Sequence, residues 1–120
     1  MRFLAMVRSN PSAMGIPPQA LMDAMRKLVQ EGFESGTLIE TGGLSFAGAR
    51  IRVRQGKITV TDGPYAESKE IVGGYAVMDY PTQEEAIAAS VRFMELHRDL
   101  WPGWEGESEV RPMERVPAPA

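Results

Sequence analysis

Residues 71–78, IVGGYAVM, decide the fold: the run is apolar throughout and contains two adjacent glycines. A continuous apolar run of this length is typical of a strand that is covered on both faces. Pro81 ends it, because proline cannot donate to a strand ladder. A second run of the same kind, from Phe3 to Val7, lies near the start of the chain. We therefore expect two buried strands.

An amphipathic helix is predicted directly after the strand at 71–78. The sequence TQEE at 82–85 matches a capping box, in which Thr82 caps the helix and the Glu85 side chain reaches back. The helix should end before Pro102. Its apolar stripe is broad and comprises Ala86, Ile87, Ser90, Phe93, Met94 and His97.

An earlier helix is predicted over residues 17–32. Leu21, Ala24, Met25 and Leu28 recur with helical spacing, and polar side chains lie away from that stripe. Pro17 suits the first turn, since its φ is preset for a helix. Gly32 is the expected stop.

Residues 50–61, RIRVRQGKITVT, predict a β-hairpin with its turn at Gln55-Gly56. This turn sets Val53 opposite Ile58 and Ile51 opposite Val60, so the apolar pairs share one face. The other face carries the basic residues Arg50, Arg52, Arg54 and Lys57. It is either a solvated surface or a dock for an acidic ligand or partner segment.

Further strands at 37–39 and 107–113 complete an order of strand, helix, strand with a hairpin, strand, helix and strand. This order predicts an α+β fold, a ferredoxin-like split β-α-β sandwich with a β-hairpin extension. Residues 1–113 are expected to form one domain and 114–120 a flexible tail. Two helices cover only one face of such a sheet, so the apolar second face predicts a homodimer packed sheet to sheet.

Composition excludes several classes of function. The chain has 120 residues, a formal net charge of −3 and no cysteine. It therefore offers no basic surplus for direct nucleic-acid binding and no thiolate for catalysis or zinc. The apolar run at the start is too short for a membrane span, so we expect a soluble, cytoplasmic protein.

The run TDGPYAESKE at 61–70, continued by Gly73-Gly74-Tyr75, resembles the signature of the YCII-related family, in the branch named for the motif DGPF. Tyr65 stands where that motif has Phe. The resemblance extends to the upstream glycines and the final strand, namely Gly36, Gly42-Gly43-Leu44, Gly48-Ala49-Arg50 and 109–112. It implies a dimeric α/β barrel, in agreement with the fold expected from the pattern.

The resemblance implies less about function. In some YCII-like proteins a histidine on the first helix, paired with an aspartate, is a proposed catalytic dyad, and residues 17–32 here contain no histidine. Relatives in the DGPF branch occur beside or fused to extracytoplasmic-function sigma factors. This implies a regulatory role, with a sigma factor as a possible protein partner.

Two residues are candidates for acid–base chemistry. Asp62 precedes Gly-Pro, where its carboxyl group either caps its own turn or serves as an acid–base group or ligand anchor. His97 is the single histidine, at the edge of the apolar helix stripe. It is either a hydrogen-bonded structural residue or, if the fold brings it close to Asp62, a general base.

Further candidates for ligand binding flank these two. Glu67, Lys69 and Glu70 are either a surface ion-pair cluster or, together with Tyr65, contacts to a polar ligand beside Asp62. The two tryptophans, Trp101 and Trp104, can wall a pocket or pack across a dimer interface.

No cofactor or metal is indicated. Gly42-Gly43 and Gly73-Gly74 begin neither a dinucleotide fingerprint nor a phosphate loop, and no metal-ligand spacing is visible. The leading hypothesis is a small-molecule-binding or regulatory homodimer with a pocket between sheet and helices. The alternatives are a cofactor-free enzyme that uses His97 and Asp62 on a small polar metabolite, and an interaction module for a sigma factor.

Overall fold

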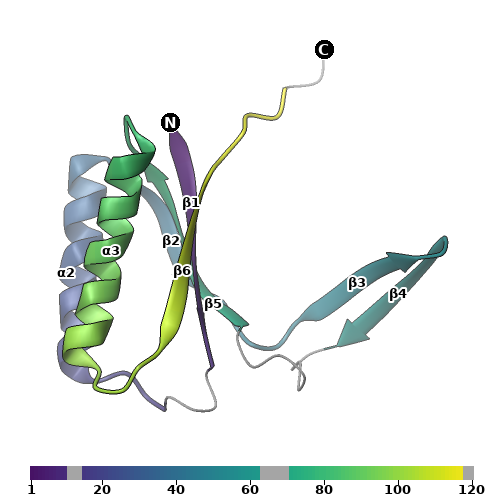
Figure 1. The fold of residues 1–120 in the computed structure, drawn as a ribbon, viewed down its shortest axis with the longest axis horizontal. Helices are drawn as coiled ribbons and strands as arrows, with labels where there is room; N and C mark the ends of the chain where they lie inside the picture. Colours follow the sequence, from purple (N-terminus) through teal and green to yellow (C-terminus); the bar gives the residue numbers. More distant parts are fainter. Residues whose placement is uncertain (11–14, 63–70, 118–120) are drawn as a thin grey trace.

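The computed structural model describes residues 1–10, 15–62 and 71–117. Within these ranges the chain forms two helices and six strands (Figure 1), whose order is β1 (Arg2–Ser9), α2 (Gln19–Ser35), β2 (Leu38–Gly43), β3 (Ala49–Arg54), β4 (Lys57–Asp62), β5 (Ile71–Asp79), α3 (Gln83–Leu100) and β6 (Gly106–Pro112). Residues 114–117 are exposed and belong to no helix or strand.

Four strands form one antiparallel sheet in the order β2-β5-β1-β6. The two apolar runs expected to be buried, at 3–7 and 71–78, are its central strands, and both helices lie on one face (Figure 1). The α+β prediction is confirmed, and the arrangement is consistent with a ferredoxin-like fold. None of the described helices combines the length and the apolar character that a bilayer crossing needs.

The core lies between the sheet and α3. Phe3 pairs with Met78 across β1 and β5, and Ala5 pairs with Ala76. Because side chains alternate along a strand, these residues all point toward the helices. Phe3, Ala5 and Met78 are buried there together with Ala86 of α3.

The opposite face of the sheet carries no helix. Leu4 pairs with Val77 and Met6 with Tyr75, one position out of step with the core residues. These four side chains are only partly buried in a single chain. We call Leu4, Met6, Tyr75 and Val77 the open sheet face.

Helix α2 is displaced along the chain from its expected range: it begins at Gln19, after Pro18 as its N-cap, so Pro17 lies outside its first turn, and Gly32 does not end it. The helix continues to Ser35 and ends at Gly36, which adopts a left-handed conformation with φ 79°. Gly32 serves a different purpose inside the helix. A Cβ there would lie 2.8 Å from the Cβ of Leu38, so the glycine lets β2 approach α2 closely.

Helix α3 begins as predicted. The Thr82 hydroxyl accepts a hydrogen bond from the backbone N–H of Glu85 at 3.3 Å and donates one to the Glu85 carboxylate. Ala86, Ser90 and His97 of the expected stripe are buried. Ile87 is 44% exposed, so it lies at the margin of the stripe.

The predicted hairpin is confirmed with its register. Val53 pairs with Ile58 and Ile51 with Val60. Gln55 and Gly56 have φ values of 51° and 75°, as the tight hairpin turn with two left-handed residues requires. Strands β3 and β4 form a separate two-stranded sheet that extends away from the helices, on the far side of the four-stranded sheet (Figure 1).

This projection makes the molecule extended. Its Cα radius of gyration is 16.5 Å. A compact chain of this length would have a radius of gyration of about 14 Å. The hairpin is therefore an arm beside the body of the fold.

Candidate functional site

A cavity of about 820 Å³ lies between the helix layer and the sheet. Its walls come from both helices, from the facing side of β1, β2 and β5, and from the segment after α3. Much of the lining is apolar, because the inner stripes of the helices meet the apolar side of the sheet; examples are Met25, Leu28, Ala76 and Phe93. The space suits a small molecule, since ligand pockets are commonly of this size.

Two buried polar side chains reach this cavity from the same face of α3. Ser90 is 9% exposed and His97 is 6% exposed, and both line the cavity together with Phe93. They lie seven residues apart, which is two helical turns and about 10 Å along the axis. A single elongated molecule can therefore contact both.

Ser90 has no hydrogen-bond partner for its Oγ among the described residues. A serine inside a helix usually satisfies its hydroxyl by donating to the carbonyl one turn earlier. A buried hydroxyl without any partner costs roughly 1–3 kcal/mol. Ser90 is thus a donor and acceptor available to a molecule in the cavity.

His97 has a defined hydrogen-bonding pattern. Its Nδ1 lies 2.9 Å from the backbone carbonyl oxygen of Phe93, and because a carbonyl only accepts, Nδ1 carries the proton. Burial lowers the pKa of His97 below its ordinary value, while the bond to the Phe93 carbonyl acts in the opposite direction. The neutral ring leaves Nε2 as an acceptor.

The two tryptophans flank His97. The rings of His97 and Trp104 are 4.6 Å apart, and those of Trp101 and Trp104 are 6.3 Å apart and stacked. Both tryptophans line the cavity, so the structure brings them together with His97. Gly106 makes this possible, because a Cβ there would overlap the Trp104 ring and lie 2.8 Å from the Arg8 carbonyl oxygen.

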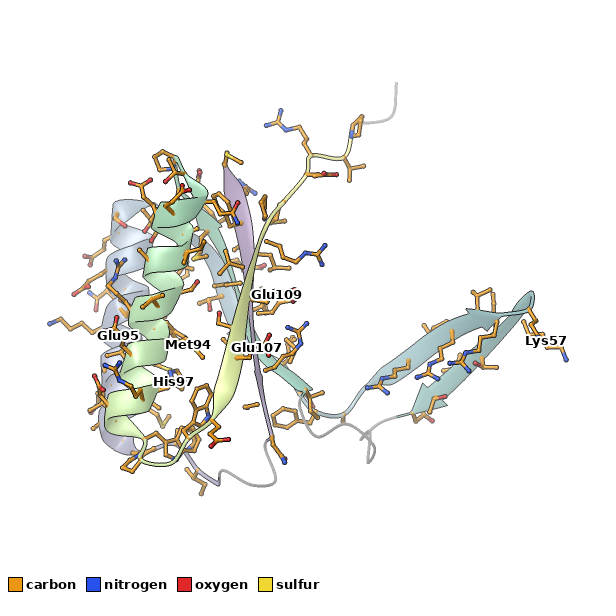
Figure 2. The ribbon with its side chains drawn as sticks, viewed as in Figure 1. Lys57, Met94, Glu95, His97, Glu107 and Glu109 are labelled. Carbon is orange, nitrogen blue, oxygen red and sulfur yellow. The ribbon has the colours of Figure 1, made fainter. Side chains whose placement is uncertain are left out.

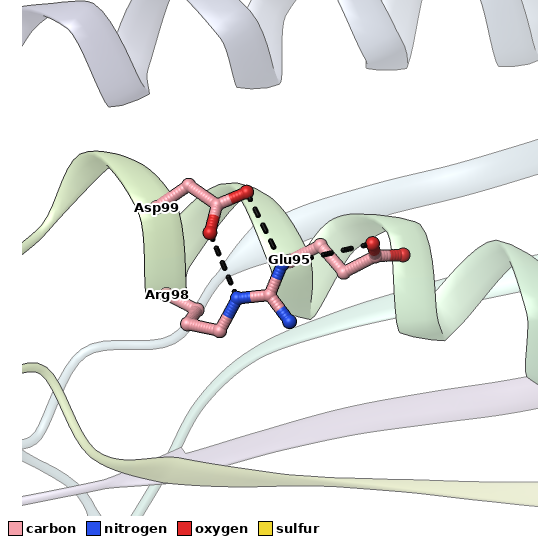
Figure 3. A network of polar contacts seen from close by, with 3 residues as sticks. All are labelled: Glu95, Arg98 and Asp99. Carbon is pink, nitrogen blue, oxygen red and sulfur yellow. Dashed lines mark hydrogen bonds and ion pairs between the residues drawn. The ribbon is translucent and has the colours of Figure 1, made fainter.

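A polar cluster next to His97 is not part of this cavity. Arg98 donates from Nε to Asp99 at 2.8 Å and lies 3.8 Å from Glu95 (Figure 3). The hydrogen bond from Arg98 lowers the pKa of Asp99. All three side chains are about half exposed or more. Ion pairs of this kind are worth little, and we assign the cluster to the helix surface.

The structure places Asp62 far from His97. Asp62 ends β4, pairs with Ala49 at the base of the hairpin and is exposed. It does not line the cavity. Figure 2 shows Lys57 at the hairpin tip and His97 on α3, on opposite sides of the sheet. Within one chain the two expected acid–base residues therefore lie in separate parts of the molecule.

The other expected contacts, Tyr65, Glu67, Lys69 and Glu70, lie outside the described residues. Among the residues that are described, no group of three or more acidic, histidine or cysteine side chains could hold a metal ion.

Ser90 is the polar group that sequence reasoning did not single out. It was placed on the apolar stripe of its helix, between Ala86 and Phe93, as a stripe residue only. The available signal was chemical: a hydroxyl at a position where the helix otherwise presents apolar side chains needs a partner in the interior.

Comparison with known proteins gives the family. A search of curated proteins finds no match. A family model described as the YCII-related domain matches residues 1–94. This range contains five of the strands and most of α3, including Ser90, and it ends before His97 and the tryptophans. The match covers well over half of the chain, which therefore belongs to the family of YCII-related domain proteins.

Proposed function

We propose that this protein is a small-molecule-binding homodimer whose ligand occupies the cavity between α3 and the sheet. The observation that carries the proposal is the buried Ser90 hydroxyl, which has no partner among the described residues and faces a cavity of ligand size. A polar group in that position is expensive unless something bonds to it. A ligand hydroxyl or amine would satisfy it.

The lining defines the chemical class of the ligand. The walls are largely apolar and aromatic, so the ligand is mainly apolar, unlike the small polar molecule that the sequence suggested. Neutral His97 offers an acceptor at Nε2, so the ligand carries an O–H or N–H donor. An alcohol, phenol or indole can bond to one of these two polar groups, and a molecule with a second hydrogen-bonding group about 10 Å away can bond to both.

The homodimer is supported by the open sheet face. Leu4, Met6, Tyr75 and Val77 are only partly buried in one chain, and a second copy would cover them. Closed twofold association is the commonest arrangement for such a surface. The barrel implied by the resemblance to the DGPF branch is this same dimer.

The enzymatic alternative has weaker support. A His97 and Asp62 pair would need the two side chains within hydrogen-bond reach of one substrate, and one chain holds them apart. Regulation of an extracytoplasmic-function sigma factor stays a prediction of the resemblance. A ligand-responsive regulator would also use the cavity, so both roles begin with ligand binding.

A thermal-shift screen tests the proposal. The probes are aliphatic alcohols, phenols and indoles, each paired with its O-methyl or N-methyl counterpart, which has the same shape without the donor. At about 100 times its dissociation constant a ligand stabilises the fold by roughly 2.7 kcal/mol. We expect a donor-bearing probe to raise Tm in the wild type and its methylated counterpart to raise it less.

Two variants locate the binding. Ser90→Ala removes the hydroxyl, and His97→Phe keeps a ring against Trp104 without its nitrogens. Each variant should reduce the rise in Tm produced by the probes that bond to the group it removes. Ser45→Ala, at an exposed serine between β2 and β3 that accepts a hydrogen bond from the backbone N–H of Ala47 and does not line the cavity, is the matched control and should leave the shift unchanged. A probe that stabilises Ser90→Ala and His97→Phe as much as the wild type would place the binding site elsewhere.

A further inference from the structure

The hairpin arm carries an apolar surface that nothing in one chain covers. Ile51, Val53 and Ile58 are each 70% exposed and Val60 is 64% exposed, although all four point to the same face of the hairpin. We call these four residues the arm face. A two-stranded hairpin with a bare apolar face is at best marginally stable in water. The arm face therefore calls for a partner surface.

The position of the arm indicates which surface this is. The hairpin leaves the body on the side of the sheet opposite the helices (Figure 1). The open sheet face looks out on that same side. A molecule that packs against the open sheet face must therefore occupy the space beside the arm.

The two surfaces also complement each other in size. Stable interfaces bury roughly 800 Å² on each partner. The four partly buried side chains of the open sheet face together offer on the order of a few hundred Å² of surface, and the four side chains of the arm face offer a similar area. Neither surface alone reaches the area that a stable dimer needs, and together they approach it.

We infer that the hairpin is a dimerisation arm, whose face formed by Ile51, Val53, Ile58 and Val60 packs against a second copy of the chain. The inference rests on the sheet-to-sheet dimer proposed above. Because twofold symmetry makes each contact reciprocal, both arms are covered at once, each by the other copy. One occupant then accounts for the exposed arm face and for the partly buried open sheet face.

The basic face of the hairpin supplies an internal control. Arg52 and Arg54 alternate with Ile51 and Val53 along β3, so they point to the opposite face of the same strand. The inference leaves that face in solvent, where positive charges also discourage strand-to-strand aggregation. Substitutions at Arg52 and Arg54 should therefore alter the hairpin surface without removing apolar contacts between copies.

The test measures self-association of the full chain by analytical ultracentrifugation. The arm variant replaces Ile51, Val53, Ile58 and Val60 by Thr, which keeps β-branched residues in the strands and removes apolar surface. The control variant carries Arg52→Thr and Arg54→Thr. We expect the dimer dissociation constant of the arm variant to rise at least roughly tenfold and that of the control to stay within about twofold.

The outcomes separate the arm from the dimer itself. A wild-type dimer whose dissociation constant is the same in the arm variant overturns the arm inference and leaves the sheet-to-sheet dimer standing. A wild-type chain that is monomeric overturns both. An equal rise in the dimer dissociation constants of the arm variant and of the control also contradicts the inference, because such an effect does not depend on the apolar face of the hairpin.

A second measurement does not depend on how the arm variant folds. The chain has no cysteine, so Val53→Cys gives a single attachment point for a spin label. The spin-labelled variant, at natural nitrogen abundance, is mixed with ¹⁵N-labelled wild type. Because only the wild type gives ¹⁵N signals, any broadening of these signals reports a contact between copies. Broadening around the open sheet face supports the inference, and a dimer without any broadening overturns it.

Discussion

The Nδ1 atom of His97 lies 2.9 Å from the backbone carbonyl oxygen of Phe93, one helical turn earlier. This bond fixes the tautomer of the only histidine in the chain and leaves Nε2 as an acceptor on a side chain that lines the cavity. Together with the unpartnered Ser90 hydroxyl on the same helix face, it gives an apolar cavity two polar anchors.

Stability should depend on pH through His97. Its pKa in the folded protein is lowered by burial, so between that value and about 6.5 the unfolded chain binds more protons. The free energy of unfolding therefore falls as the pH is lowered through this window. Urea denaturation at several pH values should show a steeper loss in the wild type than in His97→Phe. Identical pH profiles for the two proteins would contradict the burial of His97.

Gly106→Ala should disturb the tryptophan wall. A Cβ at this position overlaps the Trp104 ring and meets the Arg8 carbonyl, so the ring must move away from His97. We expect a loss of about 1–3 kcal/mol in the free energy of unfolding, as for other overpacked sites, and a red shift of tryptophan emission. Gly103→Ala, where a Cβ meets no atom, is a useful comparison for the emission. It should leave the emission wavelength unchanged even though its positive φ lowers stability.

Ser90→Ala should not destabilise the ligand-free protein. Removing a buried hydroxyl without a partner is neutral or stabilising by up to about 1 kcal/mol. Thr82→Ala removes the cap of the same helix and should cost about 1 kcal/mol. Chemical denaturation of both variants measures the contrast. A loss above about 1 kcal/mol in Ser90→Ala would mean that the hydroxyl has a structural partner.

Gly32→Ala should destabilise the protein although alanine is the better helix former. Helix propensity alone favours the change by about 1 kcal/mol. The new Cβ, however, would lie 2.8 Å from the Cβ of Leu38, and β2 would have to move away from α2. Thermal unfolding should therefore show a lower Tm. A higher Tm would mean that α2 and β2 are not tightly packed at this point.

Much of the fold follows from local sequence signals. The two apolar runs predicted the central strands β1 and β5. The capping box at Thr82 predicted the start of α3, and Gln55-Gly56 predicted the hairpin with its register. Each of these signals acts over a few residues, so the pattern alone reveals it. The predicted end of α2 was wrong for a tertiary reason. Gly32 does not stop the helix; it is a glycine because Leu38 approaches it closely.

The candidate site was harder to predict. His97 and the tryptophans were found from their chemistry and lie together at the cavity. Asp62 was selected as their acid–base partner, but the direction in which the hairpin leaves the sheet separates it from them. That direction is a property of the tertiary structure, which no local pattern encodes. Ser90 was missed as a binding group because its environment exists only after α3 packs against the sheet.

The central claim is that the cavity at Ser90 and His97 binds a donor-bearing, mainly apolar molecule. Both tryptophans of the chain line this cavity, so intrinsic fluorescence reports binding there directly. Aliphatic alcohols suit the titration because they do not absorb where tryptophan is excited. We predict a saturable emission change with the alcohols, much weaker with their methyl ethers and weaker again in Ser90→Ala. Equal responses to alcohols and ethers, or none to either, would contradict the claim.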